Sequence, residues 1–202
     1  MRFISSTMPY FYLFIGWMLF YASHSYLAAL NIKRKIQGIM GNSYKWYRLI
    51  YSLVSILGVF ALLFYSGTIP PHYLLNPTDV LQYIGYMLAT FGTIISVKSM
   101  KGISLKRFIG LAPHDDLKQK DSLVIDGLYR WVRHPLYAGL VLIFLGYFFF
   151  LPTVASMVHL IALLVYLPFG IYFEEKKLIT LHGPAYIDFQ KSVPPIIPTK
   201  KP

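Results

Sequence analysis

The 202-residue sequence contains no cysteine. This absence excludes disulfide bonds and any metal site built on thiolate ligands. Acidic residues are also scarce, with 8 Asp and Glu against 19 Lys and Arg, and only 13% of all residues are charged. Because soluble domains carry about 25% charged residues, the composition excludes an ordinary soluble globular protein and indicates an integral membrane protein.

Apolar residues, by contrast, are abundant and gather in long runs. They make up 56% of the chain, and the mean hydropathy is +0.53. A membrane-spanning helix needs about 20 predominantly apolar residues. We therefore predict an all-α polytopic protein with about five transmembrane helices, forming a single membrane domain over residues 1–202. The predicted helices cover residues 9–30, 49–66, 78–97, 136–151 and 153–173.

The net charge of +11 is unevenly distributed. Every Lys and Arg except Arg2 lies in one of three segments, 31–48, 98–135 and 174–202. Five spans place these segments on one side, which the positive-inside rule identifies as the cytosol. The N-terminus is then outside and the C-terminus cytosolic. This placement favours contact with membrane lipid headgroups and argues against nucleic acid as a partner.

Two clusters of reactive side chains bracket the last two predicted helices. The first, Gly127–Gly139, runs into the apolar stretch that starts at Leu136. Pro135 suits the first position of a helix, because its missing N–H would have no acceptor there. The N–H groups of the following residues would then face the cytosolic boundary, where a helix start attracts anions such as carboxylate or phosphate.

The second cluster is Glu174 and Glu175, which we predict in the last turn of the 153–173 helix. Carboxylates there oppose the helix dipole and need a compensating cation. Adjacent helical residues point about 100° apart, so one glutamate is expected to face a ligand while the other pairs with Arg133. Each cluster alone is typical of a solvated helix end or a topology anchor. Their convergence at one hairpin favours an active site.

The segment Arg133-His134-Pro135-Leu136-Tyr137-Ala138-Gly139 resembles the Arg-His-Pro-x-Tyr-x-Gly signature of integral membrane methyltransferases. These enzymes form the isoprenylcysteine carboxyl methyltransferase and phospholipid methyltransferase superfamily. The resemblance covers residues 95–198, although Pro195 stands where many members carry Arg. It continues in order and spacing through Glu174-Glu175-Lys-Lys-Leu178, His182-Gly183-Pro-Ala-Tyr186 and Val193-Pro-Pro-Ile-Ile-Pro198.

The N-terminal half is a weaker match. Ser23-His24-Ser25, Lys35 and Tyr47-Arg48 look like the branch that contains methanethiol S-methyltransferases and nitric-oxide-metabolism-associated membrane proteins. An ionisable residue within a span is a candidate for function. His24 is therefore interpreted either as a proton acceptor for a substrate thiol or hydroxyl, or as a histidine hydrogen-bonded between helices.

The resemblance implies S-adenosylmethionine as the cofactor, held in a cytosol-facing pocket formed by the 98–135 loop and the 174–202 tail. It also implies that no metal is needed. The catalytic candidates are His24, Arg133 and Glu174. The candidates for binding the cofactor are Tyr129, His134, Pro135, Leu136, Tyr137, Gly139, Glu174, Glu175 and Tyr186.

The leading hypothesis is an S-adenosylmethionine-dependent methyltransferase that acts on a small or lipophilic thiol, carboxylate or amine. If the chain is bacterial, its place is the inner membrane, with the active site facing the cytosol. One alternative is an NADPH-dependent membrane reductase of the sterol-reductase type, although Leu136 stands where those enzymes usually carry Asn. The other is a non-catalytic assembly factor or transporter subunit. The methyl acceptor and the oligomeric state are left open.

Overall fold

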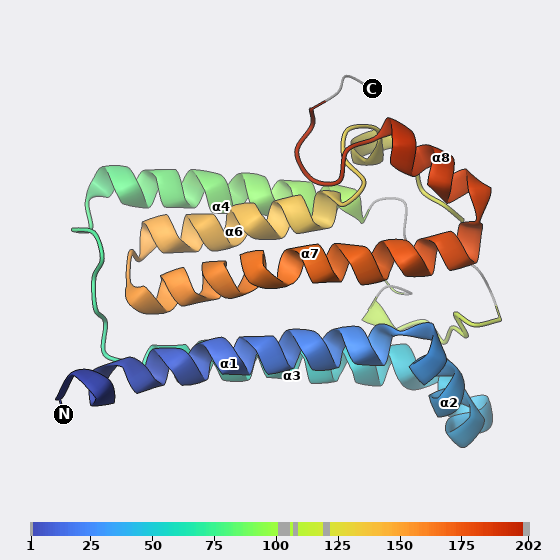
Figure 1. The fold of residues 1–202 in the computed structure, drawn as a ribbon, viewed down its shortest axis with the longest axis horizontal. Helices are drawn as coiled ribbons and strands as arrows, with labels where there is room; N and C mark the ends of the chain where they lie inside the picture. Colours follow the sequence, from blue (N-terminus) through green and yellow to red (C-terminus); the bar gives the residue numbers. More distant parts are fainter. Residues whose placement is uncertain (1, 101–105, 107–108, 119–121, 200–202) are drawn as a thin grey trace.

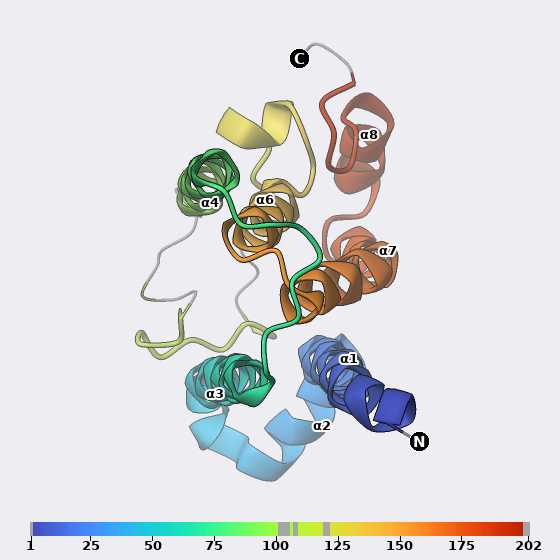
Figure 2. The ribbon, with the colours of Figure 1, turned by 90° about the vertical axis from the view of Figure 1, so that its left-hand side faces the viewer.

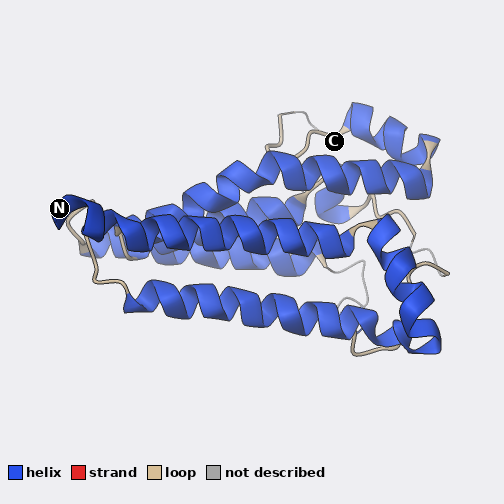
Figure 3. Ribbon diagram, turned by 60° about the horizontal axis from the view of Figure 1, so that its bottom comes forward, coloured by secondary structure: helices blue, strands red, loops and turns tan. Residues whose placement is uncertain are grey.

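The computed structural model describes residues 2–100, 106, 109–118 and 122–199, and over these residues the chain is helical. This confirms the predicted all-α class for the described part, which is drawn as helices and loops (Figure 3). Pairing of extended backbone is limited there to one isolated bridge between Tyr73 and Thr153. The helices are α1 (Arg2–Ala28), α2 (Leu30–Met40), η1 (Gly41–Trp46), α3 (Tyr47–Thr68), α4 (Asp79–Ser99), η2 (Gly127–Arg130), α6 (Pro135–Phe150), α7 (Val154–His182) and α8 (Pro184–Ser192).

The long helices run side by side, with α2 and α8 gathered at one end of the bundle (Figure 1). Viewed along the bundle, α4, α6 and α7 form one group and α1 and α3 another (Figure 2). The two groups meet where α1 packs on α7. A buried core that includes Leu13, Trp17 and Leu163 fills this contact, so α1 is held against the helix that carries Glu174 and Glu175.

Three segments are long and apolar enough to cross a membrane, namely Leu30–Thr68, Asp79–Ser99 and Val154–His182. The apolar helix α6 has 16 residues, which is shorter than a usual span. α1 has 27 residues but is not among the three. Large apolar side chains on α3 and α4 are exposed (Phe64 by 79%, Tyr83 by 71%), as expected of helices that face lipid. These features are those of an integral membrane protein.

Two helix boundaries differ from the predicted ones. α1 ends at Ala28, and after the extended backbone of Ala29 the segment predicted as a loop forms the amphipathic helix α2. α7 continues past residue 173 to His182, where Gly183 with φ 58° ends it. Glu174 and Glu175 therefore lie about two turns before the helix end, and their predicted place in the last turn is wrong. The end of the apolar run predicts where α7 leaves the membrane core, but the helix itself continues through the charged residues that follow.

Close packing joins α4 and α6 through glycines. A Cβ atom on Gly139 would lie 2.3 Å from the Ser96 Oγ and 2.7 Å from the Gly92 carbonyl oxygen, and Gly85 and Gly146 meet the partner helix in the same way. Small residues at membrane-helix interfaces allow the backbones to approach. Gly139 thus faces α4, which fixes how α6 is oriented beneath the candidate site.

Substitution of Gly139 by alanine is expected to lower the free energy of unfolding by about 1–3 kcal/mol, because the new methyl group overpacks a contact made of backbone. The matched control is Gly38→Ala in α2, where a Cβ meets nothing within 4 Å and helix propensity favours alanine. Thermal unfolding in detergent should show a lower Tm for Gly139→Ala and an equal or higher Tm for Gly38→Ala. Equal Tm values for wild type and Gly139→Ala would contradict the packing described.

Candidate active site

The start of α6 is fixed by the C-terminal segment of the chain. Pro135 is the first residue of the helix, as predicted, and His134 is its N-cap. The backbone N–H groups of Arg133 and His134 donate to the carbonyl oxygens of Pro194 and Pro195, each at 2.9 Å. Residue 195 therefore contributes through its backbone, which proline supplies as well as any other residue. As at any helix start, the N–H groups of the first turn lack acceptors within the helix.

Both carboxylate oxygens of Glu175 have hydrogen-bond partners within the protein. Its Oε1 accepts from the Nε of Arg133 at 2.7 Å and lies 3.1 Å from the Nε2 of His134, while its Oε2 accepts from the Nε2 of Gln190 at 2.7 Å. The hydroxyl of Tyr186 donates to Oε1 from 3.5 Å. The side chains of Arg133 and Glu175 are only 9% and 12% exposed. Glu175 therefore ties α6, α7 and α8 together and has little capacity left for a ligand.

Arg133 completes this junction. Beyond Glu175, its Nη1 donates to the carbonyl oxygens of Gln190, at 2.9 Å, and Val193. Burial and then the negative charge of Glu175 raise the pKa of Tyr186, so its hydroxyl stays protonated as a donor. The pairing of Arg133 with one glutamate was expected from the sequence; the extra contacts from α8 were not.

Glu174 offers the accessible carboxylate of the pair. Its side chain is 45% exposed, and its Oε2 lies 3.6 Å from the Nδ1 of His134, whose own side chain is 3% exposed. The Tyr137 hydroxyl interacts electrostatically with Glu174, and the rings of His134 and Tyr137 are 5.6 Å apart. His134 thus lies between the two glutamates, with its Nδ1 toward Glu174 and its Nε2 toward Glu175.

A line of hydroxyl groups connects this site to α1. Tyr137 interacts electrostatically with Tyr166, whose hydroxyl is 2.6 Å from the Oγ of Ser25. The ring of Tyr166 stacks on Tyr21 with centroids 4.3 Å apart. Ser25 is therefore the residue of the Ser23-His24-Ser25 motif that reaches the site. Sequence reasoning missed Tyr166, since nothing distinguishes it from the other tyrosines of the apolar runs.

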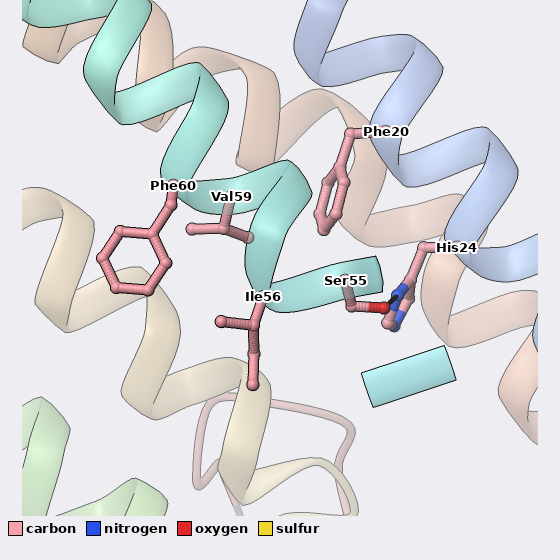
Figure 4. A pocket seen from close by; sticks show the side chains of 6 residues that line it. All are labelled: Phe20, His24, Ser55, Ile56, Val59 and Phe60. Atoms are coloured by element: carbon pink, nitrogen blue, oxygen red, sulfur yellow. Dashed lines mark hydrogen bonds between the residues drawn. The ribbon is translucent and has the colours of Figure 1, made fainter. Parts of the chain in front are cut away.

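His24 is held between α1 and α3. Ser55 Oγ donates to the Tyr51 carbonyl at 2.8 Å, so it must accept from the His24 Nδ1 at 2.9 Å. The other ring nitrogen, Nε2, accepts from the Tyr51 hydroxyl at 2.7 Å. Both nitrogens have partners, and neither bond reaches Glu174. Beside His24 lies an apolar groove of about 300 Å³ lined by Phe20, His24, Ser55, Ile56, Val59 and Phe60 (Figure 4).

The remaining predicted residues lie around the start of α6. The hydroxyl of Tyr129 donates to the Ser99 carbonyl at 3.3 Å and so ties η2 to the end of α4. Burial and then the charge of Glu174 raise the pKa of Tyr129, which places this hydroxyl within electrostatic reach of the accessible glutamate. Leu136 is half-buried in the first turn of α6. Gly139, one turn further, faces α4.

A second polar cluster, not anticipated from the sequence, clamps residues 109–118 onto α2 and η1. Asp116 forms an ion pair with Lys33 and accepts from the Tyr44 hydroxyl at 2.9 Å, while Asp115 accepts from Gln37 at 2.8 Å. Burial opposes ionisation of Asp116, but Lys33 and Tyr44 outweigh it and hold the pKa of this carboxyl below its usual range. In the described part of the chain, no group of three His, Asp or Glu side chains is placed to hold a metal ion.

Comparison with known proteins gives one family and two partial relatives. The family described as NnrU protein matches residues 12–194. A methanethiol S-methyltransferase of Crocosphaera subtropica is 39% identical over 70 residues, which cover 35% of this chain. Another from Pseudomonas deceptionensis is 36% identical over 74 residues, or 36% of this chain. Each match spans only 27% of the relative's length. No solved structure matches. These matches support the resemblance to integral membrane methyltransferases.

Proposed function

The chain belongs to the NnrU protein family, and from this membership and its two relatives we propose that it is an integral membrane methyltransferase. The donor is S-adenosylmethionine, and the acceptor is small or lipophilic, with a thiol as the first choice because both relatives are named for a thiol substrate. A carboxylate or amine acceptor is second. The site lies at the bundle end that gathers the basic segments, which we assign to the cytosol. If the protein is bacterial, we place it in the inner membrane.

The observation that carries the proposal is the division of labour between Glu174 and Glu175. The oxygens of Glu175 accept hydrogen bonds from Arg133, Gln190 and Tyr186, whereas Glu174 has an accessible carboxylate beside His134 and the start of α6. S-adenosylmethionine combines a sulfonium, an ammonium and a carboxylate. The Glu174 carboxylate is suited to bind the ammonium or sulfonium group, and an aromatic face such as that of Tyr137 also attracts cations. The N–H groups at a helix start are suited to bind the cofactor's carboxylate. The residues present therefore fit the cofactor.

Each residue then has a role that follows from its contacts. The cofactor supplies an activated methyl group for direct displacement, so alignment provides most of the catalysis. Glu174 binds the cationic end, and His134 and Tyr137 hold Glu174 in place. Arg133 acts through Glu175 by fixing the C-terminal segment against α6. A catalytic role for His24 stays a prediction, since its contacts lie on the α3 side of α1.

Binding of S-adenosylhomocysteine to the detergent-solubilised protein tests the proposal. Calorimetry should give saturable binding at sub-millimolar ligand, unchanged in the control Asp126→Asn, whose side chain is 81% exposed and pairs with Arg130 at the surface. NADPH, titrated in parallel, should not bind. No binding of S-adenosylhomocysteine at millimolar concentration, or saturable binding of NADPH instead, would overturn the assignment.

A further inference from the structure

Lys177 is a cation without a hydrogen bond or ion pair among the residues that the structure describes. It follows Glu174 by three residues on α7, so the two side chains lie on the same helix face. Lys177 is half-buried, and within the described residues its ammonium has no hydrogen bond or ion pair. A partly buried charge without a partner is costly, which points to a ligand as the missing anion.

Charged side chains from several elements surround Lys177. It interacts electrostatically with Lys33 from α2 and Arg48 from α3, and with the carboxylates of Asp116 and Glu174. Asp116 is already engaged through both oxygens, whereas Glu174 keeps an accessible side for a ligand. Asp116 uses one oxygen for Lys33 and the other for Tyr44, and Glu174 contacts His134 and Tyr137. These charged groups gather at a place that adjoins the proposed cofactor site.

We propose that Glu174 and Lys177 form a clamp for an α-amino acid group, in which Glu174 binds the ammonium and Lys177 binds the carboxylate. A separation of three residues amounts to about 4.5 Å along the helix axis, which suits two charged groups borne by one carbon atom. The clamp rests on the proposed function, because the α-amino acid is the methionine end of the cofactor. It assigns to Lys177 the recognition of that end.

Two ligands that differ only in the carboxylate test the clamp. S-adenosylhomocysteine carries it, and the decarboxylated analogue does not. Lys177→Met is expected to weaken binding of S-adenosylhomocysteine about tenfold, the effect of one charge-assisted hydrogen bond, and to leave the analogue within about twofold. The control is Lys176→Met, an exposed neighbour. Lys177→Arg should retain most of the affinity, and thermal unfolding checks that each variant is folded; Lys177→Gln replaces Lys177→Met if the latter is not.

The outcomes separate the clamp from the function on which it rests. If wild type binds S-adenosylhomocysteine but Lys177→Met weakens both ligands equally, or neither, the clamp is wrong and the proposed function stands. If wild type binds neither ligand, both fail. If the variant keeps its affinity for the cofactor but loses stabilisation by vesicles of phosphatidylglycerol, Lys177 binds a lipid phosphate and the clamp is overturned.

Discussion

Replacement of Glu175 by alanine is expected to lower the free energy of unfolding by about 3–5 kcal/mol, the cost of leaving a buried charge without its partner. The Arg133 side chain is 9% exposed and would lose its carboxylate. Gln190 and Tyr186 would lose their acceptor at the same time, so α8 would detach from α7. Thermal unfolding in detergent measures the effect, and proteolysis of the C-terminal segment reports the detachment.

A double-mutant cycle controls this prediction. Arg133→Met combined with Glu175→Met removes both charges, so the double variant should be more stable than the sum of the two single effects implies. Additive effects would mean that Arg133 and Glu175 do not stabilise the junction through each other. Unfolding of Glu175→Ala at the wild-type temperature would contradict the structural role assigned to this glutamate.

Replacement of Glu174 by glutamine is expected to reduce activity strongly while leaving stability nearly unchanged. Because Glu174 is 45% exposed and glutamine has nearly the same size and shape, the free energy of unfolding should change by no more than about 0.5 kcal/mol. Methyl transfer should fall about 100-fold, equivalent to about 2.7 kcal/mol at 1.36 kcal/mol per factor of ten. The measurement is kcat/KM with methyl-labelled S-adenosylmethionine and a small thiol, alongside thermal unfolding of the same preparation.

Asp126→Asn serves as the matched control, because it neutralises an exposed carboxylate in a different element, the 98–135 segment. It should retain wild-type kcat/KM and Tm. If Glu174→Gln retained full activity, or if it lost activity only together with stability, Glu174 would be a structural residue and the division between the two glutamates would be wrong.

The helices were largely predictable, since their positions follow from composition. Apolar runs of about 20 residues form helices wherever backbone groups have no other acceptors, and each predicted span overlaps a helix. The start of α6 was predictable to the residue because proline is favoured at the first position of a helix and Pro135 directly precedes the apolar run. The end of α7 was not, because four charged residues, Glu174–Lys177, follow the apolar run, and hydropathy says nothing about a helix that continues beyond the apolar core.

The sequence predicted that the two clusters meet at the site, but it did not predict which side chains within them pair with one another. Which glutamate is occupied depends on Gln190 and Tyr186, whose approach requires α8 to fold back on α7. The ion pair of Lys33 with Asp116 joins residues far apart in sequence, and neither residue carries a local signal. Such contacts are set by the packing of the whole bundle, which a single sequence does not display.

The most direct measurement is a structure of the protein with S-adenosylhomocysteine bound. The account predicts ligand density beside the start of α6, with the ammonium nitrogen within about 2.7–3.2 Å of a Glu174 oxygen and Glu175 still paired with Arg133. Density in the groove beside His24, or contact with Glu175 in place of Glu174, would contradict it.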